Sequence, residues 1–303
     1  RSDNPPTDIE SIFKGLTEMI SIESSNDQIE SLLSCITSLF SRISTTEEEI
    51  LSTFLPFINQ IIDSPSRFDL HPAVLDFFGR IVTIAPLTIK NELSTLVPLA
   101  VDSFSMENFE LSIAASNCLR SVSKTLPLSF SPYLEQVIPP LIAILQESGA
   151  DQDPEQEQEN ESIEKVDNEG IEKVESDEIE ISNNGFNGVD FDADLMFAKA
   201  QREAMLTLAT FVGFMPTEMA EYAQSPILDF ILGEKGGLHR YLVHACESLA
   251  YASEGYKVLG VGIYEVLGRL LPLLFESKTA KDEVFSILML ASEIVAVFGD
   301  VMS

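Results

Sequence analysis

Three aspartates at alternate positions, Asp190, Asp192 and Asp194, are the first residues whose spacing could support chemistry. Carboxylates at such positions match the start of a calcium-binding loop of the EF-hand type. That loop also needs Gly at its sixth position and Glu at its twelfth, where this chain has Leu195 and Gln201. The same aspartates fit a phosphotransfer motif only if an apolar strand precedes them, and none does. We therefore expect no metal site here, and we expect Asp192 or Asp194 to cap the helix that follows.

The histidines and cysteines offer no alternative site. His239 and His244 lie five positions apart on a predicted helix, so their side chains point about 140° apart and cannot share a metal. No Ser/His/Asp or Cys/His pattern and no phosphate-binding glycine loop is present. The sequence thus predicts a protein that is not an enzyme and has no cofactor. The three cysteines, Cys35, Cys118 and Cys246, are predicted to be buried thiols in a reducing compartment.

A strongly acidic tract, residues 149–192, interrupts the apolar periodicity of the chain. Between Asp151 and Asp194 there are seventeen Asp and Glu and two Lys, a net charge of −15 out of −31 for the whole chain. Such a segment cannot bury enough apolar surface to offset its chain entropy, so we expect it to be disordered. Its charge argues against nucleic-acid binding and favours basic protein partners. The tandem repeat within 161–176 is either a duplication in a linker or an element that orders on a partner.

Prolines reveal a repeat that surrounds this tract. Pro56, Pro98 and Pro140 are 42 residues apart, within segments whose apolar residues have helical spacing. A proline inside a helix removes a hydrogen bond, and we interpret these three as kinks.

A second series of prolines and glycines is interpreted as helix ends, with steps of 41, 86, 42 and 44 residues. The double step contains the acidic tract, which is therefore an insertion in one unit. The members of this series are Pro86, Pro127, Gly213, Gly255 and Gly299.

A period of 41–44 residues with two amphipathic helices is typical of HEAT repeats, which stack into an α-solenoid because no helix pair buries its apolar face alone. The sequence predicts six units and three regions: repeats in 1–148, the acidic insertion in 149–192, and further repeats in 193–303. The first helices of the units are predicted at 8–22, 46–63, 88–105, 131–147, 217–233 and 257–276. The second helices are predicted at 27–43, 70–86, 108–126, 195–212, 237–254 and 279–298. The most apolar stretch, 256–275, contains charged residues and a proline, so membrane insertion is not expected. Because residue 1 is Arg, we expect a piece of a longer protein.

Four stretches resemble the importin-β (karyopherin) family, in particular its importin beta-three branch. They are LSFSPYLEQVIPPLIAIL (128–145), KAQREAMLTLATFVGFMPTEMAEYAQ (199–224), CESLAYASEGY (246–256) and SEIVAVFGDVM (292–302). The placement of the acidic insertion between the two helices of a central repeat is also similar. The chain departs from the family in having no Trp at the end of the insertion, where GFNGVDF stands.

The resemblance implies a nuclear import receptor that carries basic cargo through the nuclear pore, between cytoplasm and nucleus. It implies binding of the GTP form of the small GTPase Ran and of Phe-Gly nucleoporins. The alternative is a HEAT scaffold of another assembly, of the phosphatase or chromosome-condensation type. By position, the acidic residues of the insertion are expected to contact Ran or basic cargo; the alternative is a solvated linker that keeps the solenoid soluble. These residues are Asp151, Asp153, Glu155, Glu157, Glu159, Glu161, Glu175, Asp177, Glu178, Glu180, Asp190, Asp192 and Asp194.

Overall fold

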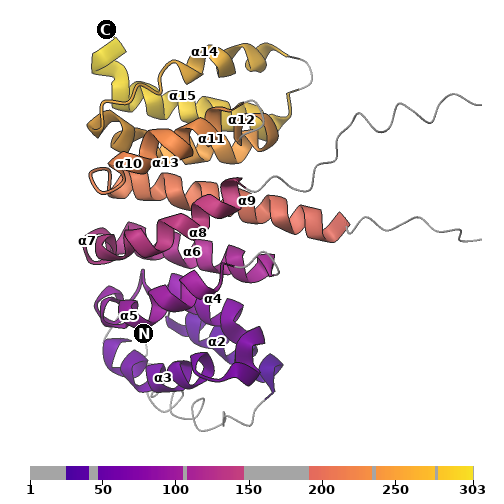
Figure 1. The fold of residues 1–303 in the computed structure, drawn as a ribbon, viewed down its shortest axis with the longest axis vertical. Helices are drawn as coiled ribbons and strands as arrows, with labels where there is room; N and C mark the ends of the chain where they lie inside the picture. Colours follow the sequence, from indigo (N-terminus) through magenta and orange to yellow (C-terminus); the bar gives the residue numbers. More distant parts are fainter. Residues whose placement is uncertain are drawn as a thin grey trace, which may run out of the picture.

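The computed structural model describes residues 25–40, 47–104, 108–146, 191–233, 237–276 and 279–302, and every regular element in these ranges is helical. The helices stack in chain order along one axis, with the earliest at one end of the column and the latest at the other (Figure 1). The predicted all-α solenoid of helix pairs is confirmed. The first predicted helix, 8–22, lies outside the described residues.

One row of the stack contains the second helix of each unit. Each helix of this row packs on the next, and the row continues across the acidic insertion without a break. The row consists of α2 (Asn26–Phe40), α4 (His71–Ile81), α6 (Phe109–Thr125), α9 (Phe191–Phe214), α13 (Leu242–Val258) and α15 (Lys281–Met302). The segment predicted as the insertion lies almost entirely outside the described residues, and the helices that flank it, α8 and α9, pack on each other.

The other row contains the first helices. Three of them are continuous and carry the predicted internal prolines: α3 (Glu47–Ile62), α5 (Pro86–Asp102) and α8 (Leu134–Gln146). Short elements connect the rows: η1 (Pro65–Leu70), α7 (Pro127–Phe130), η2 (Ser131–Tyr133) and α12 (Gly237–Arg240). Pro86 and Pro127 begin α5 and α7, so they mark helix starts and not, as we expected, helix ends.

The last two first helices differ from the prediction. The segment predicted as one helix at 217–233 is divided into α10 (Ala220–Tyr222), a π-type segment η4 (Ala223–Leu228) and α11 (Asp229–Leu232), because Ser225 before Pro226 is extended. The helix predicted at 257–276 begins only at α14 (Val266–Leu270) and continues as η5 (Leu271–Phe275).

Gly260 explains the late start of α14. It has a φ of +71°, and the next N–H, that of Val261, donates to the carbonyl of Tyr256 at 2.8 Å. This is a Schellman ending of α13, which needs a residue in the left-handed region.

Gly213 and Gly255 were expected to end helices, but both lie inside them. A Cβ on Gly213 would lie 2.1 Å from the carbonyl oxygen of Tyr251, and a Cβ on Gly255 would lie 1.9 Å from that of Val212. The two glycines therefore allow α9 and α13 to cross at close range. The step of 42 residues between Gly213 and Gly255 thus reflects helix packing. Gly299, also expected to end a helix, lies inside α15, and a Cβ on it would meet nothing within 4 Å among the described residues.

Side chains from all units form one continuous apolar core. Tyr256 is fully buried and its hydroxyl donates to the carbonyl of Ala223 at 3.1 Å, whereas the buried hydroxyls of Ser116 and Ser248 have no hydrogen-bond partner among the described residues. Cys118 and Cys246 are buried as predicted, but Cys35 is exposed because it lies on the outer side of α2.

Among the described residues, one helical stretch is long and apolar enough, by length and composition, to cross a membrane. It is Pro127–Gln146, with a mean hydropathy of 1.3, and not the stretch 256–275 considered from the sequence. Within it Leu134, Ile138 and Leu141 are buried in the core of the stack. A core helix of a helical stack passes the same test.

Candidate partner-binding surface

The predicted partner-binding carboxylates lie almost entirely outside the described residues. Asp151 to Asp190 belong to the segment 147–190, of which the structure describes nothing. Helix α9 already includes Asp192 and Asp194, so neither is its N-cap residue, contrary to expectation. Their side chains are not described. The role of the acidic insertion thus remains a prediction, and the site below comes from other residues.

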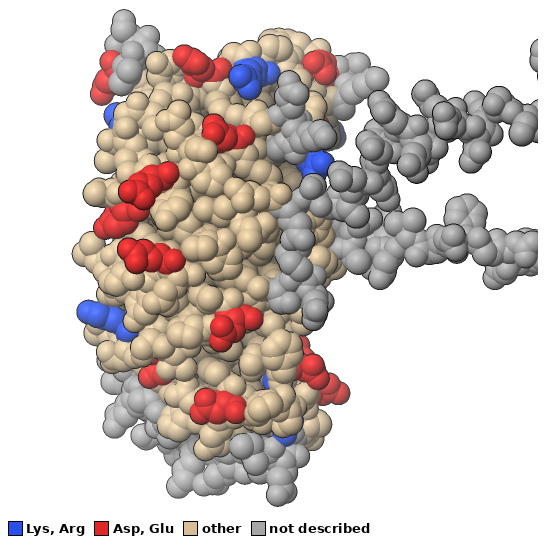
Figure 2. All heavy atoms as spheres, in the orientation of Figure 1, with Lys and Arg blue, Asp and Glu red and all other residues tan. Residues whose placement is uncertain are grey.

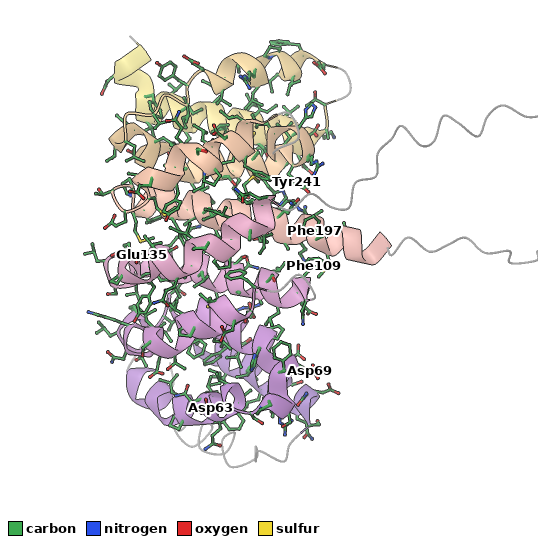
Figure 3. All side chains as sticks on the ribbon, in the orientation of Figure 1. Asp63, Asp69, Phe109, Glu135, Phe197 and Tyr241 are labelled. Atoms are coloured by element: carbon green, nitrogen blue, oxygen red, sulfur yellow. The ribbon has the colours of Figure 1, made fainter. Side chains whose placement is uncertain are left out.

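The helices on either side of the insertion are joined directly. Gln201 of α9 donates from Nε2 to the carbonyl of Ile144 in α8 at 3.1 Å, and its Oε1 accepts from the hydroxyl of Tyr241 at 3.1 Å. Phe197 packs on Phe109 of α6 with ring centroids 5.5 Å apart (Figure 3). This part of α9 is consequently fixed to both neighbouring helices.

Polar contacts also link successive helices of the second row. The hydroxyl of Thr207 in α9 donates to the carbonyl of Ser116 in α6 at 3.0 Å. Arg120 of α6 forms an ion pair of 2.9 Å with Glu203 of α9, and both side chains are mostly buried. Such contacts between helices hold the spacing of the row, on which any surface built from several helices depends.

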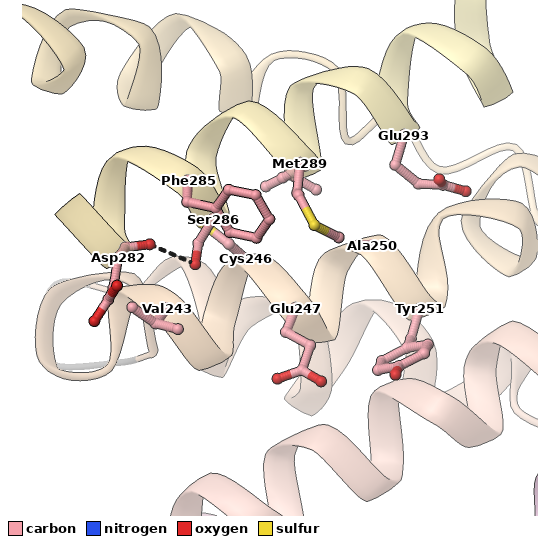
Figure 4. A pocket seen from close by; sticks show the side chains of 11 residues that line it. Val243, Cys246, Glu247, Ala250, Tyr251, Asp282, Phe285, Ser286, Met289 and Glu293 are labelled. Atoms are coloured by element: carbon pink, nitrogen blue, oxygen red, sulfur yellow. Dashed lines mark hydrogen bonds between the residues drawn. The ribbon is translucent and has the colours of Figure 1, made fainter.

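A groove of about 620 Å³ lies between α13 and α15 (Figure 4). Helix α13 contributes Val243, Cys246, Glu247, Ala250 and Tyr251, and helix α15 contributes Asp282, Phe285, Ser286, Met289, Leu290 and Glu293. The residues Phe285, Met289 and Tyr251 are exposed large apolar side chains, with exposed fractions of 64%, 53% and 39%. Exposed apolar residues gathered in one groove indicate an interaction surface more strongly than the same residues scattered singly.

The charged groups of the groove have a single sign. Glu247, Asp282 and Glu293 line it, and none of its described lining residues is Lys, Arg or His. Ser286 does not use the carboxylate of Asp282, since its hydroxyl donates to the backbone carbonyl of that residue at 2.8 Å (Figure 4). The surface therefore combines an aromatic and thioether wall with three carboxylates. This combination suits a ligand that has aliphatic stems and positive ends.

The groove has no reactive nucleophile. Burial raises the pKa of the Cys246 thiol to about 12, so the sulfur stays protonated at neutral pH. Within the described residues no group of three or more His, Cys, Asp and Glu could hold a metal ion. His244, on the same helix, has a lowered pKa, first because burial disfavours its cation and then because Arg202 lies near.

Elsewhere, acidic side chains are spread along the length of the face seen in Figure 2. Glu135 of α8 and Asp63 lie at the surface in the same view (Figure 3). Isolated surface carboxylates of this kind are ordinary solvated charges. What distinguishes the groove is the association of its carboxylates with exposed apolar side chains.

Comparison with known proteins gives the fold. No protein-family model matches the sequence, and no curated protein matches it. The solved structure of Kap121p bound to Nup53p matches 96% of this chain with a TM-score of 0.51 and 17% identity. The fold is that of a karyopherin segment. The resemblance stated from the sequence is confirmed at the level of a karyopherin-like helical-repeat fold.

Two further Kap121p structures are similar. The one bound to RanGTP covers 95% of this chain with a TM-score of 0.49 and 16% identity. The one bound to the extreme C-terminus of the protein phosphatase Cdc14p covers 96% with a TM-score of 0.49 and 17% identity. The chain spans 26% of the length of each Kap121p chain, and at these identities the likeness concerns the karyopherin-like fold alone.

Sequence reasoning did not identify the groove. The apolar residues of α15 recur at helical spacing, as at Ile287 and Ile294. The structure buries Ile287 and Ile294, whereas Phe285 and Met289 lie outside the buried stripe. Two large apolar residues outside the buried stripe of a helix were a usable signal. The carboxylate of Glu247 on α13, however, becomes their neighbour only through packing.

Proposed function

We propose that this chain is a segment of a nuclear transport receptor and that its groove between α13 and α15 binds a Lys- or Arg-containing segment of a partner protein. The observation that carries the proposal is the composition of the groove. Three carboxylates, Glu247, Asp282 and Glu293, accompany exposed apolar side chains, and no described lining residue is basic. The karyopherin-like fold supports the class of protein, and the groove supports the class of ligand.

The chemistry of recognition follows from the two parts of a basic side chain. The aliphatic stem of Lys or Arg packs against Phe285 and Met289, while its charged end is attracted to the carboxylates on both helices. Glu247 and Asp282 are exposed, so each charge is worth only a few tenths of a kcal/mol to about 1 kcal/mol in water. Binding therefore requires several basic residues acting together. The acidic tract of the insertion would increase the rate of encounter with such a ligand.

Ran in its GTP form, Phe-Gly nucleoporins and shuttling between cytoplasm and nucleus are proposed for the full-length protein. Their support is the sequence resemblance together with the similarity of the fold to Kap121p, which one solved structure shows bound to Nup53p. The insertion residues Asp151 to Asp194 remain the proposed contact for Ran or basic cargo.

The proposal is tested by titrating the chain with a fluorescent synthetic peptide that carries four Lys or Arg among apolar residues. The triple variant Glu247→Gln, Asp282→Asn, Glu293→Gln is expected to bind about tenfold more weakly or worse, because three attractive charges are lost. Glu135→Gln, an exposed carboxylate on α8, is the matched control and should bind like the wild type. Equal affinity of the triple variant and the wild type would refute the assignment of the groove.

The transport part of the proposal needs a separate measurement. The full-length protein should be retained by immobilised Ran loaded with GTP and much less by Ran loaded with GDP. Retention that is independent of the nucleotide, or none at all, would favour the HEAT scaffold of another assembly.

A further inference from the structure

Tyr251 belongs both to the groove and to the helix contact next to it. Tyr251 lines the groove, while its carbonyl oxygen faces Gly213 in the close crossing between α9 and α13. Figure 4 shows Tyr251 and Glu247 extending from the same side of α13. The position of this ring is thus set by the backbone of α9, not by a flexible loop.

A cation from the second helix row already occupies this ring. The ammonium of Lys124, in the last turn of α6, lies 3.8 Å from the centroid of the Tyr251 ring. Lys124 of α6 and Tyr251 of α13 belong to the two helices that pack on α9, so this contact joins the helices on either side of it. A cation over an aromatic face at this distance is attracted by the negative potential of the ring.

We propose that Lys124 is an internal competitor for basic ligands of the groove. Its ammonium lies over one face of the Tyr251 ring and so weakens the attraction of that ring for a second cation, and its charge opposes that of a basic ligand beside Glu247. A basic ligand must displace Lys124 from the ring or forgo the aromatic contact. Lys124 thereby sets the number of basic residues that a ligand needs for stable binding. This inference rests on the proposed function of the groove.

The position of Lys124 on the Tyr251 ring explains how a strongly acidic groove can select ligands with several basic residues. A single surface lysine from any protein would gain the carboxylates but not the ring, because Lys124 is bound there at high effective concentration. A ligand with several basic residues gains enough from Glu247, Asp282 and Glu293 to compensate. Lys124 is in this sense a specificity-determining residue that acts through Tyr251.

The test repeats the peptide titration described above with two substitutions of Lys124, one substitution of Tyr251 and a control substitution of Lys90. Lys124→Met, which keeps the length of the side chain without its charge, should tighten peptide binding about two- to fivefold, the range of an exposed cation–π contact. Lys124→Arg preserves the cation and should bind like the wild type. Lys90→Met removes an exposed lysine of α5 and should have no effect. In a Tyr251→Leu background the gain from Lys124→Met should disappear.

Two results would overturn the inference while leaving the proposed function intact. One is unchanged or weaker binding by Lys124→Met when the triple carboxylate variant shows the expected loss. The other is an equal gain with and without the Tyr251 ring, which would mean a general charge effect. If the triple variant binds as well as the wild type, the ligand does not use the groove, and the proposed function and this inference fail together.

Discussion

Gln201 donates a hydrogen bond of 3.1 Å to the backbone carbonyl of Ile144, although 57 residues separate them in the sequence. This bond joins α9 to α8 across the acidic insertion. The two helices of the interrupted unit therefore pack as a pair, and α9 takes its place between α6 and α13 in the second row. This packing supports the prediction that the acidic tract is an addition to a repeat that its flanking residues complete by themselves.

Removal of the insertion is accordingly expected to leave the stability of the stack unchanged. Replacement of residues 149–188 by a Gly/Ser linker of about twenty residues should shift the thermal unfolding midpoint by no more than about 2 °C, because the linker is long enough to span the gap flexibly. Gln201→Leu is expected to lower stability by about 1–3 kcal/mol, since it leaves buried polar groups without partners. Gln136→Leu, at an exposed site of α8, is its control. A large loss of stability on removing the insertion would contradict its description as an addition.

The close crossing of α9 and α13 requires glycine at positions 213 and 255. Gly213→Ala and Gly255→Ala should each destabilise the chain by about 1–3 kcal/mol, because the new methyl group would overlap a backbone carbonyl. Gly268→Ala in α14 meets nothing within 4 Å and should be neutral or stabilising by about 0.5–1 kcal/mol. Unfolding by urea, followed by circular dichroism, measures all three. Equal behaviour of Gly213→Ala and Gly268→Ala would show that the helices do not cross as described.

Features set by local sequence could be predicted, whereas features set by the packing of distant helices could not. The spacing of Pro56, Pro98 and Pro140 was sufficient to predict three first helices and the period of the stack. In a repeat protein each unit packs in the same way, so the same sequence pattern recurs in each unit. The role of Gly213 was misassigned, since a glycine that ends a helix and one that permits a close crossing look alike in sequence. The groove was missed because Glu247 and Phe285 are brought together only by the packing of two helices.

Protonation of His244 should make the fold less stable in mild acid. Its pKa is lowered from 6.5 in the folded chain, first by burial and then by Arg202, so the unfolded chain binds the proton more readily. The stability that the neutral His244 side chain contributes is complete above pH 6.5. It is lost as the pH falls through the lower pKa of the folded chain. His244→Gln should therefore show a smaller drop in unfolding midpoint between about pH 7.5 and pH 5 than the wild type.

The control for this prediction is His239→Gln, at an exposed position, which should follow the wild type. His71, whose pKa is also lowered by burial, is expected to account for part of the remaining slope. If His244→Gln and His239→Gln give the same pH dependence, the burial of His244 is not what the structure indicates.

The three thiols should differ in reactivity. Cys35 is exposed and is expected to react with a disulfide reagent within minutes in the folded chain. Burial raises the pKa of Cys118, and raises that of Cys246 to about 12, so both should react only after unfolding. Counting the thiols that react before and after denaturant is added checks this, and Cys35→Ser should abolish the fast reaction. Rapid labelling of Cys246 would mean that the floor of the groove opens readily.

The central claim is that basic partner segments bind between α13 and α15, and photochemical cross-linking locates them most directly. A Lys/Arg-rich peptide that carries a benzophenone group, irradiated with the full chain and digested, is expected to label Met289 and neighbouring residues of α15. An excess of unlabelled peptide and the triple carboxylate variant should both suppress this label. Labelling confined to the first helix row or to the insertion, with none on α13 or α15, would contradict the account.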